Sequence, residues 1–330
     1  MKEKKQFINL LRVLAAVCIT NSHFANVWPM SGIASGGMLG DVLFFAISGY
    51  CLYRPEFKMQ DFGRWYIKRI RRIYITVILI ALLTGFFTGF PLSVSGWLHT
   101  FIYPTNYHFV ASIMVLYIVY YVWMNLLKRW KISIGISTVV FSVAVLIVYV
   151  LTFDKSWYHI DVVENHFIRF LFFAAMLLGA YFREAEQKVG KYTANSAWKN
   201  GMLAIVSIIV YFAVRLAVPR FGLYAVQILT WAAILFALYC IIRWAEFLEP
   251  FLIKLPGKVK GILEFLAGIT LQIYLVQFPI IERFETIIFP INLIVITIII
   301  IAVSVIGYGI DRVIQKGIDY VVDFRKNIRI

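Results

Sequence analysis

The chain has 330 residues, of which 62% are hydrophobic and only 15% charged, and its mean hydropathy is +0.82. This composition excludes an ordinary soluble domain and predicts an all-α integral membrane protein. The 32 Lys and Arg outnumber the 17 Asp and Glu, giving a formal charge of +15. In a soluble protein this excess would indicate nucleic-acid binding, whereas in a membrane protein its meaning depends on which loops hold the basic residues.

Ten apolar segments are long enough to cross a bilayer in about 20 residues each. They are Phe7–Trp28, Leu39–Tyr53, Ile73–Phe90, Phe109–Leu127, Ile132–Thr152, Phe167–Phe182, Met202–Val218, Tyr224–Ile242, Ile262–Ile281 and Ile291–Ile310. The first follows a basic leader, as a secretory signal does, but its length and the presence of Arg12 predict a retained helix. About ten spans leave no room for an appended soluble domain, so residues 1–330 are predicted to form one polytopic domain.

Basic residues alternate between the two sides of this arrangement. Most lie in the N-terminal tail, after residue 311, and in the stretches 54–72, 128–131, 183–199 and 243–260. The opposite side holds only Lys155, Arg215, Arg220 and Arg283. The positive-inside rule therefore predicts that both termini are cytoplasmic, next to anionic membrane lipids, and it accounts for the net charge without nucleic acid.

The three cysteines lie inside apolar stretches, at Cys18, Cys51 and Cys240. This placement supports neither a disulfide framework nor a zinc knuckle. We expect packing roles for them and no metal site in the protein.

Two ionisable residues of the first span, Arg12 and His23, are eleven positions apart. Eleven steps of about 100° end within about 20° of the starting direction, so one helix face is expected to carry both, about 16 Å apart along the axis. Ionisable groups inside spans are costly and mark candidate sites. The alternative is that Arg12 reaches the inner phosphates and His23 lies at the outer interface.

An acidic residue, Asp41, lies at the outer end of the second span. In an antiparallel hairpin it would lie at a depth close to His23 and could orient the imidazole in catalysis. A role as N-cap of the second helix is equally consistent with its position. Ser48 is not expected to be a nucleophile, because Ser48 and Gly49 lie within a helix with no preceding strand; they indicate close helix packing.

The motifs Arg12-x10-His23, Phe44-Phe45-x-x-Ser48-Gly49-Tyr50 and Arg69-x-x-Arg72, in this order, resemble the membrane-bound acyltransferase 3 family. The later segments Tyr107-His108-Phe109 and Ile273-Tyr274-Leu275-Val276-Gln277 are similar to the family more loosely. Two features depart from it: the usual Trp at the entry to the fourth span is absent, and Gln277 stands where His is common.

The resemblance implies transfer of an acyl group, commonly acetyl from cytoplasmic acetyl-CoA, to a hydroxyl of a sugar or cell-envelope glycan, in a bacterial plasma membrane. Arg64, Arg69 and Arg72 would then bind donor phosphates, since guanidinium groups pair bidentately with phosphate oxygens. Arg12 would guide the thioester end of the donor. His23 would take the hydroxyl proton or carry the acyl group itself. The positive-inside rule alone also accounts for the basic cluster.

Polar residues on the predicted outer side are candidates for the acceptor. Four of them, which precede or enter the sixth span, are the expected substrate-binding group: Asp161, Glu164, His166 and Arg169. Aromatic and histidine side chains there suit sugar rings, but an interfacial belt would have the same composition. A transporter or flippase of a glycan or lipid-linked sugar is the alternative function; it explains the spans and buried charges but not the arginine and histidine motifs.

Overall fold

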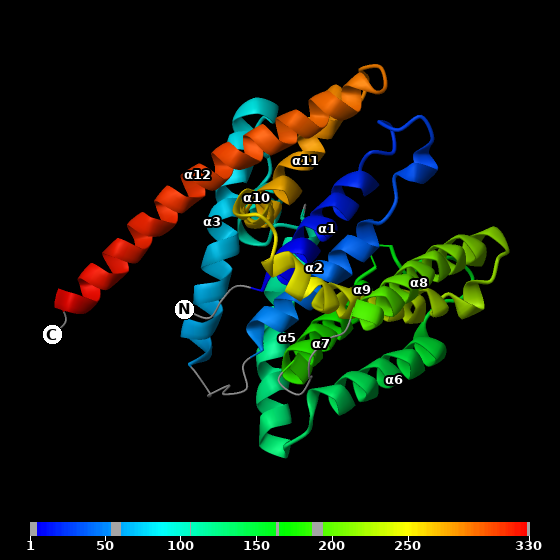
Figure 1. Cartoon of the computed structure of the whole chain (residues 1–330). Coiled ribbons are helices and arrows are strands. Elements are labelled where there is room, and N and C mark those ends of the chain that lie inside the picture. Colours follow the sequence, from blue (N-terminus) through cyan, green and yellow to red (C-terminus); the bar gives the residue numbers. More distant parts are fainter. Residues whose placement is uncertain (1–4, 54–60, 106, 163–164, 187–193, 329–330) are drawn as a thin grey trace. The chain divides into compact units, whose positions relative to one another are not determined.

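The computed structural model describes residues 5–53, 61–105, 107–162, 165–186 and 194–328, and within them every regular element is helical (Figure 1). The elements are α1 (Gln6–Ser22), η1 (Ser31–Ile33), α2 (Gly37–Leu52), α3 (Phe62–Thr88), α4 (Val94–Trp97), η2 (Leu98–Ile102), α5 (His108–Trp130), α6 (Ile134–Thr152), α7 (Ile168–Ala185), α8 (Ala194–Arg220), η4 (Tyr224–Val226), α9 (Leu229–Ile253), α10 (Gly257–Gly268), α11 (Thr270–Phe284) and α12 (Ile291–Ile328).

Six helical segments of the described chain are long and apolar enough to cross a membrane, or seven if the bent pair α10–α11 is one span. They are Ser31–Leu52, α5, α6, Ser196–Arg220, α9 and Ile291–Tyr320. An all-helical, multi-pass membrane protein is therefore supported. The number of ten spans and the cytoplasmic placement of both termini stay predictions.

The first helix is shorter than its apolar segment, which continues to Trp28. Helix α1 ends at Ser22, and the next two amides, of His23 and Phe24, bond to carbonyls three residues back rather than four. The side-chain amide of Asn21 donates to the backbone carbonyls of Ile33 and Ser35 in the segment that follows, at 2.8 and 3.0 Å. The apolar segment therefore continues beyond the end of the helix, where the side chain of Asn21 bonds to the backbone of the segment that follows.

The ninth predicted span, Ile262–Ile281, is interrupted. Helix α10 ends at Gly268 and α11 begins at Thr270, with Ile269 between them at φ −99° and ψ 6°. Glycine is a poor helix former, so a break beside it is inexpensive. Average hydropathy does not register such a break.

The described helices form two compact units whose segments alternate along the chain. Unit 1 consists of Met1–Ala15, Met38–Met59 and Ile118–Ala267. Unit 2 consists of Ala16–Gly37, Gln60–Tyr117 and Gly268–Ile330. Helices α6 to α9 therefore belong to unit 1, and α3, α11 and α12 to unit 2.

Helices α2 and α7 of unit 1 cross at very close range. A Cβ atom on Gly49 would collide with the carbonyl oxygen of Met176, and a Cβ on Gly179 would collide with that of Ala46. The two glycines therefore let each backbone lie directly against the other. This confirms the packing role predicted for Gly49.

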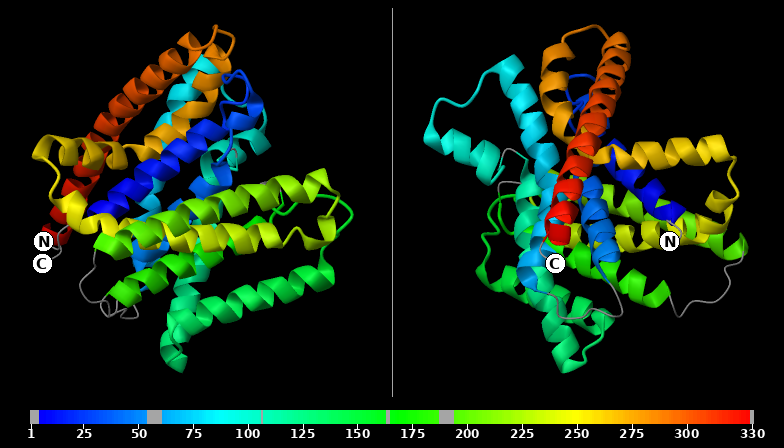
Figure 2. Two further views of the ribbon diagram at one scale, coloured as in Figure 1. Left: turned by 45° about the vertical axis from the view of Figure 1, so that its right-hand side comes forward. Right: turned by 90° about the vertical axis from the view of Figure 1, so that its left-hand side faces the viewer.

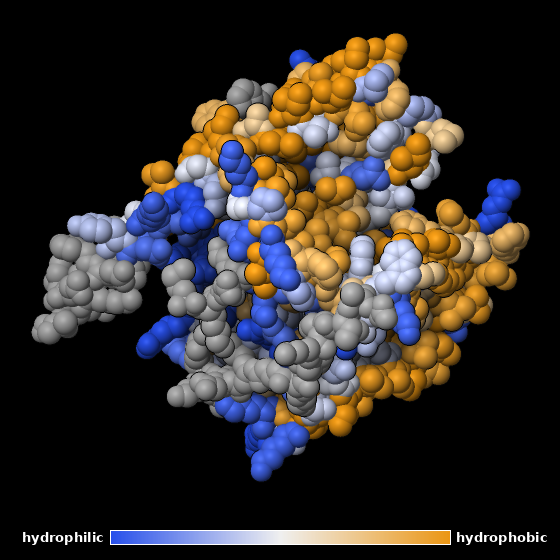
Figure 3. Space-filling model, in the orientation of Figure 1, coloured by the Kyte–Doolittle hydropathy of each residue, from blue (hydrophilic) through white to orange (hydrophobic). Residues whose placement is uncertain are grey.

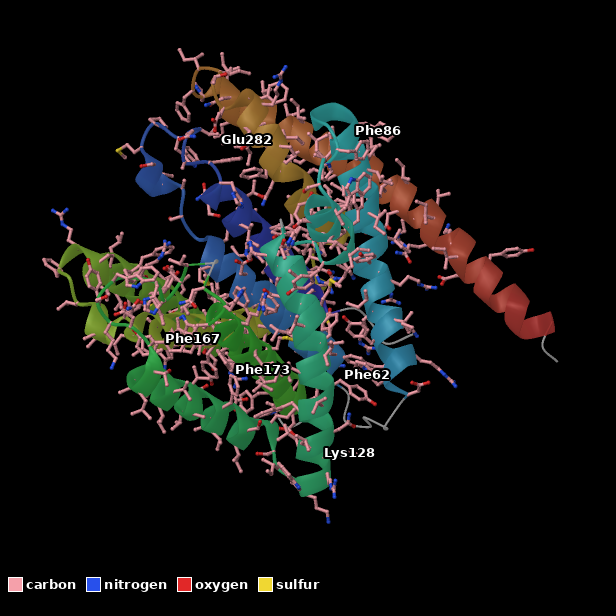
Figure 4. The ribbon with its side chains drawn as sticks, turned by 180° about the vertical axis from the view of Figure 1, so that it is seen from behind. Phe62, Phe86, Lys128, Phe167, Phe173 and Glu282 are labelled. Atoms are coloured by element: carbon pink, nitrogen blue, oxygen red, sulfur yellow. The ribbon has the colours of Figure 1, made fainter. Side chains whose placement is uncertain are left out.

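Aromatic rings fill the remaining space around α7, where Figure 4 labels Phe167 and Phe173. The ring of Phe173 lies 5.6 Å from that of Trp123 and 5.0 Å from that of Phe141, measured between centroids. Phe167 stacks on Trp231 at 4.6 Å. Such ring pairs contribute about 0.5 to 1.5 kcal/mol each beyond the area they bury, so they fix α7 against α5, α6 and α9.

Helices α3, α11 and α12 pack together in unit 2 (Figures 1 and 2). They meet at Gly307 of α12, where a Cβ atom would lie 3.3 Å from Cδ1 of Ile80 and 3.8 Å from Cγ of Gln272. Ile80 and Gln272 are both buried. The small residue lets three helices share one contact point.

Apolar side chains also cover much of the outer surface. In the apolar windows of α6, α8 and α12, only 22 to 28% of the residues are buried, and Figure 3 shows apolar surface over α8 and the upper part of α12. Soluble proteins rarely expose continuous apolar patches of this kind. These faces are suited to contact with lipid.

Replacing Gly49 with alanine should destabilise unit 1, because the added methyl group has no space against the α7 backbone. Overpacking of this kind typically costs about 1 to 3 kcal/mol. Gly261 is the matched control, since no heavy atom lies within 4 Å of its Cβ position and alanine there should be neutral or stabilising. Thermal unfolding in detergent measures both; an unchanged Tm for Gly49→Ala would contradict the close crossing.

Candidate functional site

The start of helix α1 is held by a carboxylate from a distant helix of unit 1. The backbone amides of Gln6 and Phe7 donate to the two carboxylate oxygens of Glu249 in α9, at 3.0 and 2.6 Å. The first turn of α1 has no acidic residue of its own. Glu249 therefore supplies both the acceptors and the negative charge that a helix N-terminus favours.

The side chain of Gln6 extends this network. Its Nε2 donates to Glu264 at 2.7 Å, and its Oε1 accepts from Asn9 at 3.1 Å. Glu264, an ionisable residue in a predicted span, is thus satisfied by a neutral amide. The polar groups of this end of α1 bond to one another and to α9 and α10, which fixes the rotation of α1 about its axis.

A second polar cluster in unit 1 surrounds Glu186, at the C-terminal end of α7. Its carboxylate pairs with Lys5 at 2.7 Å and with Arg183, and it accepts from the hydroxyl of Tyr50 at 2.8 Å. Burial acts to raise the pKa of Glu186, but the hydrogen bonds from Lys5 and Tyr50 and the charges of Lys5 and Arg183 outweigh it, so that this pKa is lowered. The cluster joins the N-terminal segment, α2 and α7.

Arg12 lies two turns into α1 and is half-buried. Its Nη2 is 3.8 Å from the Sγ of Cys51 in α2, and among the described residues it pairs with no carboxylate. An arginine inside an apolar helix usually has an acidic partner or a functional role. Its proposed role toward the donor stays a prediction.

The four arginines of α3 fall into two kinds. Two exposed or half-buried arginines form ion pairs, Arg64 with Asp61 at 3.3 Å and Arg71 with Asp319 at 2.5 Å. The other two belong to the Arg-x-x-Arg motif.

Those two, Arg69 and Arg72, lie three residues apart within α3, so the stretch is helical, as their neighbouring placement requires. The guanidinium of Arg69 lies 4.0 Å from the ring centre of Trp65 and donates to the Trp65 carbonyl at 2.9 Å. The side chain of Arg72 is exposed and makes no contact with an acidic group in the described chain. Arg69 is held in place by Trp65, and Arg72 is the more exposed of the two.

His23 lies directly after α1, in unit 2, and is half-buried. Its ring meets that of Phe278 in α11 edge to face, at 6.1 Å between centroids. One turn back, the Thr20 hydroxyl donates to the Oε1 of the buried Gln277 at 2.7 Å. Because the amide of His23 bonds to the carbonyl of Thr20, the Thr20–Gln277 bond fixes the backbone from which the imidazole projects.

The same face of α11 carries Tyr274, four residues before Phe278. The rings of Tyr107, His108 and Phe109 all lie within 6.3 Å of the Tyr274 ring, and its hydroxyl accepts from the Phe109 amide at 3.3 Å. Within unit 2, His23 and the aromatic residues 107–109 at the start of α5 thus both contact α11. Both loosely similar segments of the sequence converge there.

Asp41 is the fifth residue of α2, which begins at Gly37. The alternative role as N-cap is therefore wrong, since a cap precedes the first helical residue. Asp41 is buried within unit 1 and is electrostatically coupled to the hydroxyl of Tyr211 in α8. Its proposed relation to His23 stays a prediction.

The expected acceptor residues occupy different surroundings. Asp161 pairs with Arg215 of α8 at 2.6 Å, whereas His166 is exposed and Arg169 is the second residue of α7. Glu164 lies outside the described residues.

Several residues of these networks carry no sequence motif. Arg215, assigned above to the opposite side of the membrane, does give a signal, because it lies inside the predicted span Met202–Val218. Tyr211, one turn before it, and Glu249 give no signal, because a tyrosine in a span and a glutamate near a span end are ordinary. No group of three or more metal-ligating side chains occurs in the described residues.

A family model described as an acyltransferase domain matches residues 5–310, which include both arginine motifs, His23 and Gln277. No curated protein and no solved structure matches the chain.

The cluster around Glu186 should make stability depend on pH. Its lowered pKa means that the ion pairs contribute above the unfolded-state value of 4.5 and are lost as the pH falls through the lower folded value. Because Lys5 is 41% exposed, solvent screening limits the contribution at pH 7 to about 1 kcal/mol.

Glu186→Gln should therefore lower the Tm at pH 7, and its difference from the unaltered protein should shrink as the pH falls below 4.5. Glu184→Gln is the control, because that neighbouring carboxylate forms no ion pair in the described part of the chain. A difference independent of pH would rule out the ionised carboxylate as the source.

Proposed function

Since this chain belongs to the acyltransferase 3 family, we propose that it is a membrane O-acetyltransferase that moves an acetyl group from acetyl-CoA to a hydroxyl of an envelope polysaccharide or lipid-linked sugar. The observation that carries the proposal is the family match over residues 5–310. The protein is an acyltransferase of the membrane; the acetyl donor, the sugar acceptor and a bacterial plasma membrane are the proposed specifics.

The basic residues support a donor that carries phosphate. Arg72 is exposed on α3, Arg69 is held beside it by Trp65, and guanidinium groups bind phosphate oxygens in a fixed geometry. The proposed donor side is the cytoplasm, because the loops with most of the basic charge would lie there. Arg12 would meet the thioester end, since its guanidinium has no competing carboxylate in the described chain.

His23 supplies the proposed acid–base chemistry. Its imidazole would accept the proton of the sugar hydroxyl as the oxygen attacks the thioester carbonyl, and the C–S bond would then break to release CoA as the thiol. In a second route the imidazole is acylated first, CoA leaves, and the sugar hydroxyl then takes the acyl group from His23. Both routes give one acetyl ester and one free thiol. Both also need the imidazole in a fixed position, which the Thr20–Gln277 bond favours by fixing the backbone of His23.

Arg72→Ala should weaken acetyl-CoA binding by about 10- to 100-fold, because a charge-assisted phosphate contact is typically worth about 1.5 to 3 kcal/mol. Arg69→Ala should weaken it as well and also lose the contact with Trp65. Lys258→Ala, which removes an exposed charge from α10, is the control for unspecific attraction. Equilibrium binding of acetyl-CoA to the purified variants measures this. Equal affinity in Arg72→Ala and Lys258→Ala would mean that Arg72 does not bind the donor and that the positive-inside rule alone accounts for it.

His23→Ala should abolish acetyl transfer while acetyl-CoA still binds, since loss of a general base costs about 10² to 10⁴-fold. Arg12→Gln, in contrast, should weaken donor binding too. CoA release and donor binding, each measured on both variants, separate the two roles. Near-normal transfer by folded His23→Ala would contradict the mechanism without affecting the family assignment.

A further inference from the structure

A short irregular segment of unit 1, residues 157–161, is fixed in place by side chains of the α9 region. The amides of His159 and Ile160 both donate to Oε1 of Gln227, at 2.8 and 3.0 Å, and Nε2 of Gln227 donates to the Trp157 carbonyl at 2.9 Å. The indole of Trp231 donates to the Ile160 carbonyl at 2.8 Å. Gln227 and Trp231 are buried. A loop with its backbone groups bonded in this way is rigid rather than adaptable.

Two polar residues of the rigid segment are Tyr158 and Asp161, and the second of them contacts α8. Asp161, whose side chain is only 4% exposed, pairs with Arg215, whose side chain is 36% exposed. Burial, and then the charge of Asp161, raise the pKa of Tyr158, which indicates that this phenol stays neutral beside the carboxylate. The ion pair therefore lies at the edge of a buried polar cluster, with Arg215 on its accessible side.

The buried part of the cluster contains a polar group without a partner. Tyr211 is 0% exposed, and its hydroxyl makes no hydrogen bond with any described residue. It lies one helical turn from Arg215 and is electrostatically coupled to Arg215, Asp161, Tyr158 and Asp41. A buried hydroxyl that bonds to nothing destabilises the fold. For packing alone, phenylalanine would fill the same space without that penalty.

The charges of the cluster favour a neutral ligand. Two carboxylates, Asp41 and Asp161, and one guanidinium, Arg215, act electrostatically on the Tyr211 hydroxyl, so a phosphate beside that hydroxyl would meet more negative than positive charge. A sugar ring instead offers hydroxyls that both donate and accept. Carboxylate oxygens keep free lone pairs after pairing with one arginine, and a phenol can donate or accept as needed.

We propose that Asp161, Arg215 and Tyr211 form a subsite that binds a neutral sugar ring of the acceptor through its hydroxyl groups. The inference rests on the proposed function and gives it a ligand class. One sugar hydroxyl donates to Asp161, and another accepts from Arg215 at the accessible edge of the cluster. Side chains at that edge move aside for the ring, so that a further sugar hydroxyl forms a hydrogen bond with the hydroxyl of Tyr211. The segment 157–161 holds the carboxylate in position before the sugar arrives, so little ordering is needed on binding.

Tyr211→Phe tests the subsite, because it removes one oxygen and keeps the ring. Tyr149→Phe is the control for a buried hydroxyl without a hydrogen bond: Tyr149 of α6 is also 0% exposed and its hydroxyl also makes no hydrogen bond in the described residues, but its ring lies 6.3 Å from that of His159 and is not paired with Asp161 or Arg215. The probes are methyl glycosides of neutral hexoses, with glucose 6-phosphate as the charged comparison. CoA release from acetyl-CoA is measured on the purified full-length protein with and without each probe, and the rise in Tm caused by each probe is measured separately.

We expect Tyr211→Phe to have an equal or higher Tm and a KM for the methyl glycoside raised about 10-fold. The glycoside should also raise the Tm of the unaltered protein and of Tyr149→Phe, but not that of Tyr211→Phe. A purely structural role of Tyr211 would change neither the KM nor the glycoside-induced rise in Tm.

An unchanged KM and an unchanged glycoside-induced rise in Tm in Tyr211→Phe would overturn the subsite. A preference for glucose 6-phosphate, or no effect of any neutral glycoside on either readout, would overturn the neutral ligand. If the unaltered protein releases no CoA, the proposed function fails, while the rise in Tm still decides whether this cluster binds a sugar.

Discussion

A polar group buried among apolar helices must find a partner, and this constraint accounts for most of the side-chain arrangement in both units. Glu249 is the clearest case: it is buried within α9, which is apolar enough to span a membrane, and its carboxylate is satisfied by the two amides that begin α1. The same bond removes two unpaired donors and fixes the start of the helix that carries Arg12. The register of the residues central to the proposed chemistry thus depends on one carboxylate far away in sequence.

Two of the incompletely satisfied polar groups among the described residues are central to the proposals. Arg12 contacts a thiol but no carboxylate among the described residues, and the Tyr211 hydroxyl is buried without a hydrogen bond. Neighbouring charges show that the protein can pair such groups, as Asp161 with Arg215 and Glu186 with Lys5. We infer that Arg12 binds the acyl donor and that the Tyr211 hydroxyl binds the acceptor.

Much of the fold follows from the sequence because hydropathy reports where apolar helices lie, and each expected span falls on helical structure. Hydropathy does not report where a helix stops, so the end of α1 at Ser22 and the break at Ile269 are not evident from it. The helical setting of Arg69 and Arg72 and the packing of Gly49 were predictable from spacing and residue size. The bonds of Glu249 with Gln6 and of Gln277 with Thr20 join residues more than 240 positions apart, and no local pattern encodes such pairs.

The most direct test of the account is acetyl transfer across a membrane. The purified protein would be reconstituted in one orientation in vesicles, with ¹³C-acetyl-CoA on one side and a neutral methyl glycoside on the other, and the ester would be detected by mass spectrometry. We predict a labelled ester when the donor is on the side of the basic face of α3 and the acceptor is opposite. No ester in any arrangement, or ester only with both reactants on one side, would contradict the proposed path.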